Sequence, residues 1–159
     1  MRRMLIATVN HTTGVLNRFS GILTRRQVNI ESISVGRSEV KGNARITIVI
    51  DVDDLDEAEQ VTKQLNRMID VIKVQDITDE PHMEREVALV KLSAPPERRS
   101  EIFSMIEPFR TNVIDVASRS ITVQITGTSD KIDAFVEVIS PYGIKQIART
   151  GATGLTRGN

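Results

Sequence analysis

Hydrophobic and polar positions along the chain follow an order that occurs twice. In the first half, a short apolar run typical of a buried strand precedes residues that repeat apolar side chains at helical spacing. Two strand-like segments come next, and Ile46, Ile48 and Ile50 lie on one side of the second. The predicted elements are a strand at 4–9, a helix at 15–27, strands at 30–35 and 45–52, a helix from 54 and a strand at 71–77.

Capping residues stand where these two helices begin. Thr12 or Thr13 is placed so that its hydroxyl can cap the first helix. Asp54 and Glu57 have the spacing of a capping box at the start of the second. The predicted apolar stripe of the first helix is Val15, Leu16, Phe19, Ile22 and Leu23.

The same order begins again in the second half of the chain. Pro95 and Pro96 indicate the start of a helix, and Thr128 or Ser129 can cap another. The predicted elements are a strand at 87–92, a helix after 96 with Ile102, Phe103 and Ile106 inside, strands at 113–116 and 121–125, a helix from 128 or 129 and a strand at 144–148. Each half therefore reads strand, helix, strand, strand, helix, strand.

This order predicts an α+β protein made of two tandem ferredoxin-like modules. Right-handed crossovers place both helices of a module on one face of an antiparallel sheet, so the other face and the edge strands need cover. We expect the first module at 1–78, a linker containing Pro81 at 79–84, and the second module at 85–159. Residues 150–159 have no periodicity, which predicts either a disordered end or a segment that orders on a partner.

Composition narrows the possible functions. Lys plus Arg and Asp plus Glu both number 21, so the formal net charge is +0 and the basic excess of a general nucleic-acid binder is missing. The strand at 45–52 lacks the aromatic residues on which an RNA-recognition motif stacks bases. The chain has no cysteine, and no apolar run approaches the length of a membrane span. We therefore expect a cytoplasmic protein.

Residues suited to catalysis are scarce. His11 and His82 are the only histidines, and neither has metal-ligand spacing to another ligand. Thr12 adjoins His11, but a nucleophile–base pair needs a geometry that adjacency in sequence does not supply. The acidic run at 51–59 is typical of a capped, solvated helix start. We expect no catalytic residue, metal site or cofactor on this chain, and keep a small hydrolase dependent on His11 as an alternative.

The turn around Gly14 is the candidate binding site. A strand has just ended there and a helix begins, so free N–H groups and the positive end of the helix dipole meet. An amino-acid carboxylate could bind the amides near Gly14, Val15 and Leu16, and the Asn10 amide oxygen could accept from the ammonium group. Asn29 begins the next strand, a natural pairing edge, and could reach a ligand held by a neighbouring chain. The simpler alternative is that Gly14 only lets the chain turn, and local spacing by itself favours it.

Several segments resemble one known family. Gly14–Leu16 and Arg25–Gly36 (RRQVNIESISVG) closely resemble the N-terminal ACT domain of the acetolactate synthase small subunits. The similarity continues at Lys63–Asn66, Asp70–Val71, Glu84–Glu86, Leu89–Lys91, Gly127–Phe135 and Ala148–Gly151. It thus extends over essentially the whole chain.

This resemblance implies a non-catalytic regulatory subunit in branched-chain amino-acid biosynthesis. Such a subunit binds and activates a catalytic (large) subunit, and thiamine diphosphate is expected on that partner. The resemblance also implies feedback inhibition by valine or another branched-chain amino acid, bound between the ACT domains of a homodimer. The implied effector residues are Asn10, His11, Thr13, Gly14, Val15 and Leu16 of one chain, with Asn29 and Ile30 of the partner chain. A free-standing ACT-type amino-acid sensor that regulates a different partner is the alternative.

The chain departs from the family pattern in two places. The family loop usually carries its Asn three positions before the glycine, where this chain has His11, and Asn10 comes one position earlier. Either Asn10 turns into the site or His11 takes the polar role, with a different pH response. The second module has Ala94–Glu97 (APPE) in place of a glycine loop, so a scaffold or docking role is expected for it.

Overall fold

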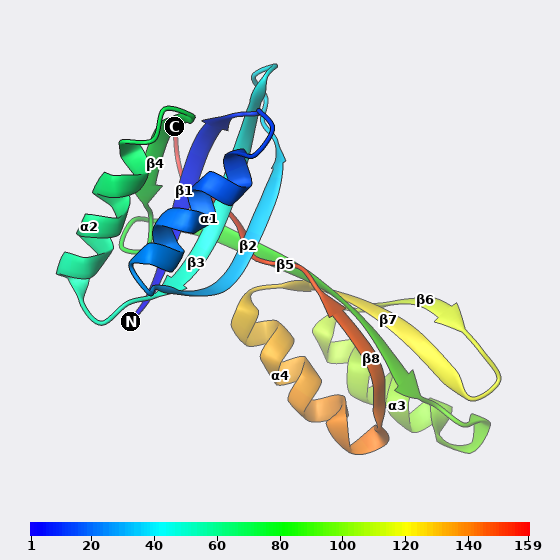
Figure 1. Ribbon diagram of the computed structural model, residues 1–159. Helices are drawn as coiled ribbons and strands as arrows, with labels where there is room; N and C mark the ends of the chain where they lie inside the picture. Colours follow the sequence, from blue (N-terminus) through cyan, green and yellow to red (C-terminus); the bar gives the residue numbers. More distant parts are fainter. The chain divides into compact units, whose positions relative to one another are not determined.

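The chain forms two units, each built on an antiparallel sheet. The computed structural model describes residues 1–159, which divide into a first unit, residues 1–84 with 151–159, and a second unit, residues 85–150. The elements of the first unit are β1 (Arg2–Asn10), α1 (Val15–Arg25), β2 (Asn29–Arg37), β3 (Asn43–Asp51), α2 (Leu55–Asn66), β4 (Val71–Asp76) and β9 (Thr153–Thr156). Its sheet has the order β2-β3-β1-β4, with α1 and α2 on one face (Figure 1).

The second unit repeats this arrangement. Its elements are β5 (His82–Ser93), which starts in the first unit, α3 (Arg99–Ile106), β6 (Asn112–Val116), β7 (Ser120–Gly127), α4 (Ser129–Ile139) and β8 (Ile144–Arg149). The strand order β6-β7-β5-β8 corresponds to that of the first unit. The prediction of two ferredoxin-like modules of the α+β class is confirmed.

Alternation along β1 and β3 builds the main core of the first unit. Side chains such as Leu5, Ile48 and Ile50 face the helices and are fully buried among Phe19 of α1 and Leu65 of α2. Burial of such aliphatic side chains is the main favourable contribution to folding. In the second unit, the corresponding core contains Ala88, Val90, Leu92, Ile102, Ile106, Ile121, Val123, Ile125, Ile132, Phe135 and Ile139.

Two residues assigned to apolar stripes are more exposed than expected. Leu16 of α1 is 42% exposed and Phe103 of α3 is 40% exposed. Both follow buried neighbours, Val15 and Ile102, so helical spacing placed them at the border of the stripe. Phe103 is therefore not part of the interior that the sequence pattern predicted.

The last residues change the expected boundaries. We expected 150–159 to be a disordered end or to order on a partner, but the chain returns to the first unit and forms β9, which pairs with β5 (Figure 1). The second unit consequently ends at residue 150, whereas the expected module ran over 85–159. The expected linker at 79–84 also differs, because β5 already begins at His82.

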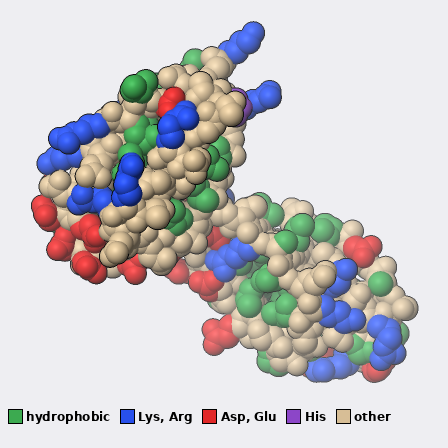
Figure 2. Space-filling view, in the orientation of Figure 1, with side chains coloured by type: hydrophobic (Ala, Val, Ile, Leu, Met, Phe, Trp, Pro, Cys, Tyr) green, Lys and Arg blue, Asp and Glu red, His purple; other side chains and the backbone are tan.

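The capping box of α2 is present as predicted. The amide of Glu57 donates to Asp54 Oδ1 at 2.8 Å, and the amide of Asp53 donates to Glu57 Oε2 at 2.8 Å. The acidic side chains around this helix start gather at one end of α2 in Figure 2. Negative charge there is favourable because it faces the positive end of the helix dipole. No helix of the chain is long and apolar enough to span a membrane.

The core assignment predicts a sharp contrast between two isoleucines of the first unit. Ile48 is 0% exposed and Ile69 is 97% exposed. We expect Ile48→Ala to lower the free energy of unfolding by about 2–5 kcal/mol, because it leaves a cavity between sheet and helices. Ile69→Ala should change it by less than about 0.5 kcal/mol. Urea denaturation followed by circular dichroism measures both, and equal losses would contradict the assignment.

Candidate functional site

The turn between β1 and α1 is organised by Gly14. Its φ is +82°, in the left-handed region that glycine adopts without strain. Gly14 is itself the residue before the helix, and no side chain caps the helix. The expectation that Thr12 or Thr13 provides the cap is wrong. Instead, Thr12 Oγ1 donates to Asp70 Oδ1 at 3.3 Å, in the loop before β4.

Some backbone N–H groups at this turn already donate hydrogen bonds within the chain, and others do not. The amide of Val15 donates to Thr12 O at 3.3 Å and so belongs to the turn. The amides of Gly14 and Leu16 donate to no group of the chain. They lie at the start of α1, where the helix dipole favours a negative charge. Two of the three amides expected to receive a carboxylate are therefore available.

Arg18 and Asp70 brace the turn from one side. Arg18 Nε donates to Asp70 Oδ2 at 2.7 Å, and its Nη1 donates to Thr13 O at 3.3 Å. The same Nη1 lies 2.8 Å from the position that a Cβ on Gly14 would occupy. The Asp70 carbonyl accepts from the amide of Asn10 at 2.8 Å. Asp70 thus joins the end of β1 to the first turn of α1.

This contact has an electrostatic consequence. The hydrogen bond from Arg18, aided by its charge and by the bond from Thr12, holds the pKa of Asp70 below its usual value. The guanidinium also adds a positive charge beside the free amides. Figure 2 shows Lys and Arg side chains over the face formed by α1 and α2. Because Arg18 is paired with Asp70, the attraction for an anion at this turn rests mainly on the free amides and the helix dipole.

A hollow of about 720 Å³ adjoins the turn. It lies between α1 and the loop before β4 and is lined by Asn17, Arg18, Gly21, Ile22, Arg25, Met68, Ile69 and Asp70. None of the residues at 10–16 lines it. The predicted effector residues of the turn therefore do not contribute to this hollow.

Asn29 and Ile30 lie far from the turn within one chain. Asn10 pairs with Asn43 at one end of β3, whereas Asn29 pairs with Asp51 at the other. The nine residues of β3 separate these ends by about 27 Å at the usual rise per residue. Asn29 is exposed and Ile30 is half-buried, both on the edge strand of the sheet. The two halves of the predicted site therefore do not meet within one chain.

Asn10 and His11 both remain available at the turn. The amide of His11 donates to Gly42 O at 2.8 Å, which fixes its backbone against the β2–β3 hairpin, while both side chains are exposed. His82 Nδ1 lies 2.8 Å from Glu80 O, to which it donates. No cluster of three or more His, Asp or Glu side chains suited to a metal ion is present.

Sequence reasoning missed Arg18 and Asp70. Arg18 comes four residues after Gly14 and so lies one helical turn further along, a spacing that would have pointed back to the glycine. Asp70 had no such signal, because it reaches the turn only through the pairing of β1 with β4. Tertiary contacts alone bring it there.

The sequence and the structure were both compared with known proteins, and both comparisons point to the same family. A family model described as "AHAS small subunit-like ACT domain" matches residues 5–73, and one described as "Small subunit of acetolactate synthase" matches residues 85–158. The acetolactate synthase small subunit of Lactococcus lactis subsp. lactis (strain IL1403) is 59% identical over 158 residues, 99% of this chain and 100% of that protein. This chain belongs to the family of acetolactate synthase small subunits.

Other members of the acetolactate synthase small subunit family support the same conclusion. The small subunit of Bacillus subtilis (strain 168) is 52% identical over 158 residues, 99% of this chain and 92% of that protein. The crystal structure of the small subunit from Thermotoga maritima superposes with a TM-score of 0.91 at 34% identity, and covers 100% of this chain and 99% of that one. The first unit is accordingly an ACT domain.

The Arg18–Asp70 contact predicts a specific pH dependence. Since the pKa of Asp70 is lower in the folded chain, this carboxylate contributes stability above about pH 4, the ordinary Asp value, and loses it as the pH falls through the folded pKa. We expect Asp70→Asn to be less stable than the unmodified chain at pH 7, with the difference shrinking in acid. Urea denaturation between pH 7 and pH 3 measures it.

Glu39 supplies the control for this experiment. It is exposed in the β2–β3 hairpin and forms no ion pair. Glu39→Gln should change the free energy of unfolding at pH 7 by less than Asp70→Asn does, because Glu39 has no ion-pair partner to lose. A difference between Asp70→Asn and the unmodified chain that stays constant with pH would contradict the assigned role of the Asp70 charge.

Proposed function

We propose that this chain is the regulatory subunit of an acetolactate synthase and that two chains share two valine sites, each made of the Gly14 turn of one ACT domain and Asn29 of the other. Family membership supports the first part. The separation of the Gly14 turn from Asn29 along β3 carries the second, because one chain cannot bring them together. A second copy of the chain would supply the missing half.

The free edge of β2 is the surface through which two copies would pair. β2 is the outermost strand of its sheet, so its outer N–H and C=O groups lack strand partners. Arg37, at the end of β2, pairs with Ala44, directly beside the Asn10–Asn43 pair at the turn. Antiparallel pairing of two β2 edges around a two-fold axis would bring the partner's Asn29 toward this end. The proposed site follows from that symmetry.

Each part of an amino acid would find a suited group. The free amides of Gly14 and Leu16, with Arg18 beside them, would hold the carboxylate. Side-chain oxygens of Asn10 and the partner's Asn29 would accept from the ammonium group. Leu16, which is 42% exposed, and Ile30 offer apolar surface for a branched side chain. His11 and Thr13 border the turn.

The regulated partner is the catalytic subunit. Binding that spans two chains can shift an assembly equilibrium, which gives the effector a route to enzyme activity. We propose that the chain activates the large subunit and that valine reverses this effect. Thiamine diphosphate would lie on the large subunit, and no residue of this chain is assigned to it.

Two measurements test this function. Calorimetric titration of valine into the isolated chain should show binding at or below millimolar concentration, with leucine and isoleucine as comparisons. Mixing the chain with its cognate large subunit should raise acetolactate formation, and valine should lower it again. Failure of all three amino acids to bind would reject the effector site. Binding without any effect on acetolactate formation would favour the free-standing sensor instead.

The proposed position of the ligand's carboxylate, beside Gly14, predicts the effect of Gly14→Asp. The new carboxylate would repel that of the ligand, so we expect valine affinity to fall by roughly tenfold or more. Because φ is +82°, the substitution should also cost about 1–2 kcal/mol of stability. Calorimetry measures the affinity of the variant, and denaturation its stability.

Gly14→Ala is the matched control. It has the same backbone strain and the same approach to Arg18 Nη1, a flexible group that can move, but no charge. We expect it to retain clearly higher valine affinity than Gly14→Asp. Equal affinities in the two variants would reject the proposed carboxylate position.

The two-chain arrangement predicts complementation. Asn29→Ala should weaken valine binding as a homodimer, as Gly14→Asp does. In a mixed dimer of the two variants, one site would carry both changes and the other neither. We expect calorimetry of the purified mixed dimer to show one site of normal affinity per dimer. If each site lay within one chain, the mixed dimer would have no normal site.

A further inference from the structure

The C-terminal segment, residues 151–157, covers the sheet face of the first unit opposite the helices. Ala152 is fully buried in a small cluster with Met4, Ile6, Val49 and Ile77. The amide of Gly154 donates to Thr47 Oγ1 of β3 at 3.3 Å in a buried position. Further along, the amide of Arg157 donates to Pro81 O at 2.8 Å. The segment is thus fastened to the centre of the sheet.

Where this segment enters the first unit, it lies against β2. A Cβ added to Gly151 would lie 2.7 Å from Ile33 O and 2.8 Å from Ile33 C. Real Cβ atoms do not approach so closely, and the obstacle is backbone rather than a movable side chain. Only glycine fits here without displacement of one of the two segments. Ile33 belongs to the strand that carries Asn29 and Ile30.

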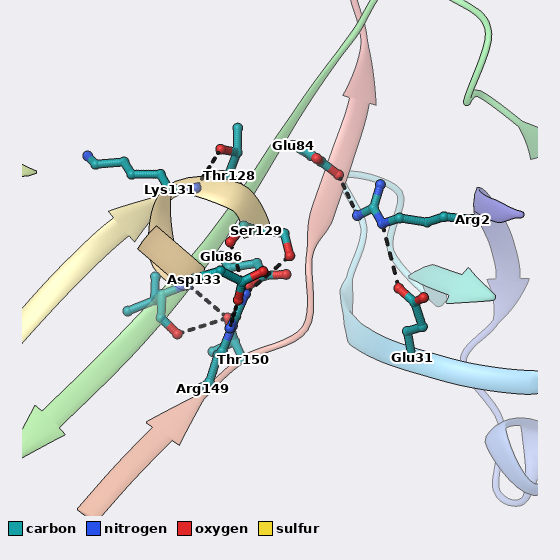
Figure 3. Close-up of polar contacts among 11 residues, drawn as sticks. Arg2, Glu31, Glu84, Glu86, Thr128, Ser129, Lys131, Asp133, Arg149 and Thr150 are labelled. Carbon is teal, nitrogen blue, oxygen red and sulfur yellow. Dashed lines mark hydrogen bonds and ion pairs between the residues drawn. The ribbon is translucent and has the colours of Figure 1, made fainter. Parts of the chain in front are cut away.

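A second contact ties β2 to the chain that leaves the first unit. Arg2 Nη2 donates to Glu84 Oε2 at 3.1 Å, and Arg2 Nε lies 3.6 Å from Glu31 Oε2. Figure 3 shows Arg2 between these carboxylates, with Glu31 on β2. Glu31 directly follows Ile30, and Glu84 is the last residue before the second unit. One connection therefore contacts β2 directly at Gly151, and the other is linked to β2 through Arg2 of β1.

Within the second unit, the ends of these connections are joined to each other. Arg149 Nε donates to Glu86 Oε2 at 2.7 Å, and its Nη1 to Asp133 Oδ1 of α4 at 2.6 Å (Figure 3). The amide of Thr150 donates to Val87 O at 2.9 Å, and the amide of Val87 donates to Thr150 Oγ1 at 2.9 Å. Because Glu86 is only 6% exposed, loss of Arg149 would leave its buried carboxylate without a compensating charge.

From these contacts, we infer that Gly151 and Arg2 couple the effector strand β2 to the second unit. An effector bound at Asn29 and Ile30 would change the position of β2, and the two connections would pass that change to the second unit along the covalent chain. This inference rests on the proposed function and adds the route by which valine acts. It requires no particular placement of one unit on the other.

Gly151→Ala tests the coupling. The new methyl group would force the segment away from Ile33. Ile33 pairs with Ile48 in the middle of β3, away from the Asn10–Asn43 pair at the turn, and the substitution does not alter Asn29. We expect valine affinity of the isolated chain to stay within about threefold of the unmodified chain. Inhibition of the assembled enzyme at saturating valine should fall to less than about half of its normal extent.

Gly21→Ala is the control, since Gly21 lies on α1 away from β2 and a Cβ there meets nothing within 4 Å. It should bind valine and be inhibited normally. Arg2→Gln provides a second variant that leaves the backbone at 151 untouched, and it should reduce inhibition in the same direction. A purely structural role would lower the melting temperature of the variants without changing the extent of inhibition.

The outcomes separate the inference from the proposed function. Valine inhibition that is normal in the unmodified enzyme, in Gly151→Ala and in Arg2→Gln would overturn the inference alone. Loss of valine binding in Gly151→Ala would also overturn it, because the segment would then support the site rather than transmit its state. Absence of valine inhibition in the unmodified enzyme would overturn the proposed function, and the inference with it.

Discussion

The pairing of β1 with β3 is the constraint on which the candidate site depends. Nine consecutive residue pairs join these strands without a register shift, from Arg2–Asp51 to Asn10–Asn43. This register puts the Gly14 turn at one end of the sheet and the start of β2 at the other. Because a one-residue slip would turn every buried side chain of the strand to the other face, the core strongly specifies the register. Hydrophobic packing therefore keeps the Gly14 turn and Asn29 at opposite ends of the sheet in one chain, which is why the proposed site draws its two halves from different chains.

The two units share a topology but differ where β1 and β5 turn into helices. In the first unit, a left-handed Gly14 leaves amides free beside Arg18. In the second, Pro95 is extended and lacks an N–H, and Arg99 Nε donates to Ala94 O at 2.9 Å. The amide of Ala94 donates in turn to Arg119 O at 2.9 Å. This second turn is occupied by its own contacts, and the scaffold or docking role expected for this unit stays a prediction.

Local patterns in the sequence predicted most elements, and tertiary contacts account for what they missed. Alternation at Ile46, Ile48 and Ile50 and the Asp54–Glu57 pair act within a few residues, so strand β3 and the cap of α2 could be predicted. Thr12 was misassigned because its hydroxyl bonds Asp70, which is distant in sequence. The return of residues 151–157 was also missed, because small residues such as Gly151 and Ala152 show no periodicity. Their fit depends on the shape of the sheet face that they cover.

The most direct test of the two-chain site is a crystal structure of the chain grown with valine. Our account predicts valine between two copies related by a two-fold axis. Its carboxylate would accept from the amides of Gly14 and Leu16 of one chain, and Asn29 of the other would contact its ammonium group. Valine bound wholly within one chain, for example in the hollow lined by Arg25 and Ile69, would contradict the account.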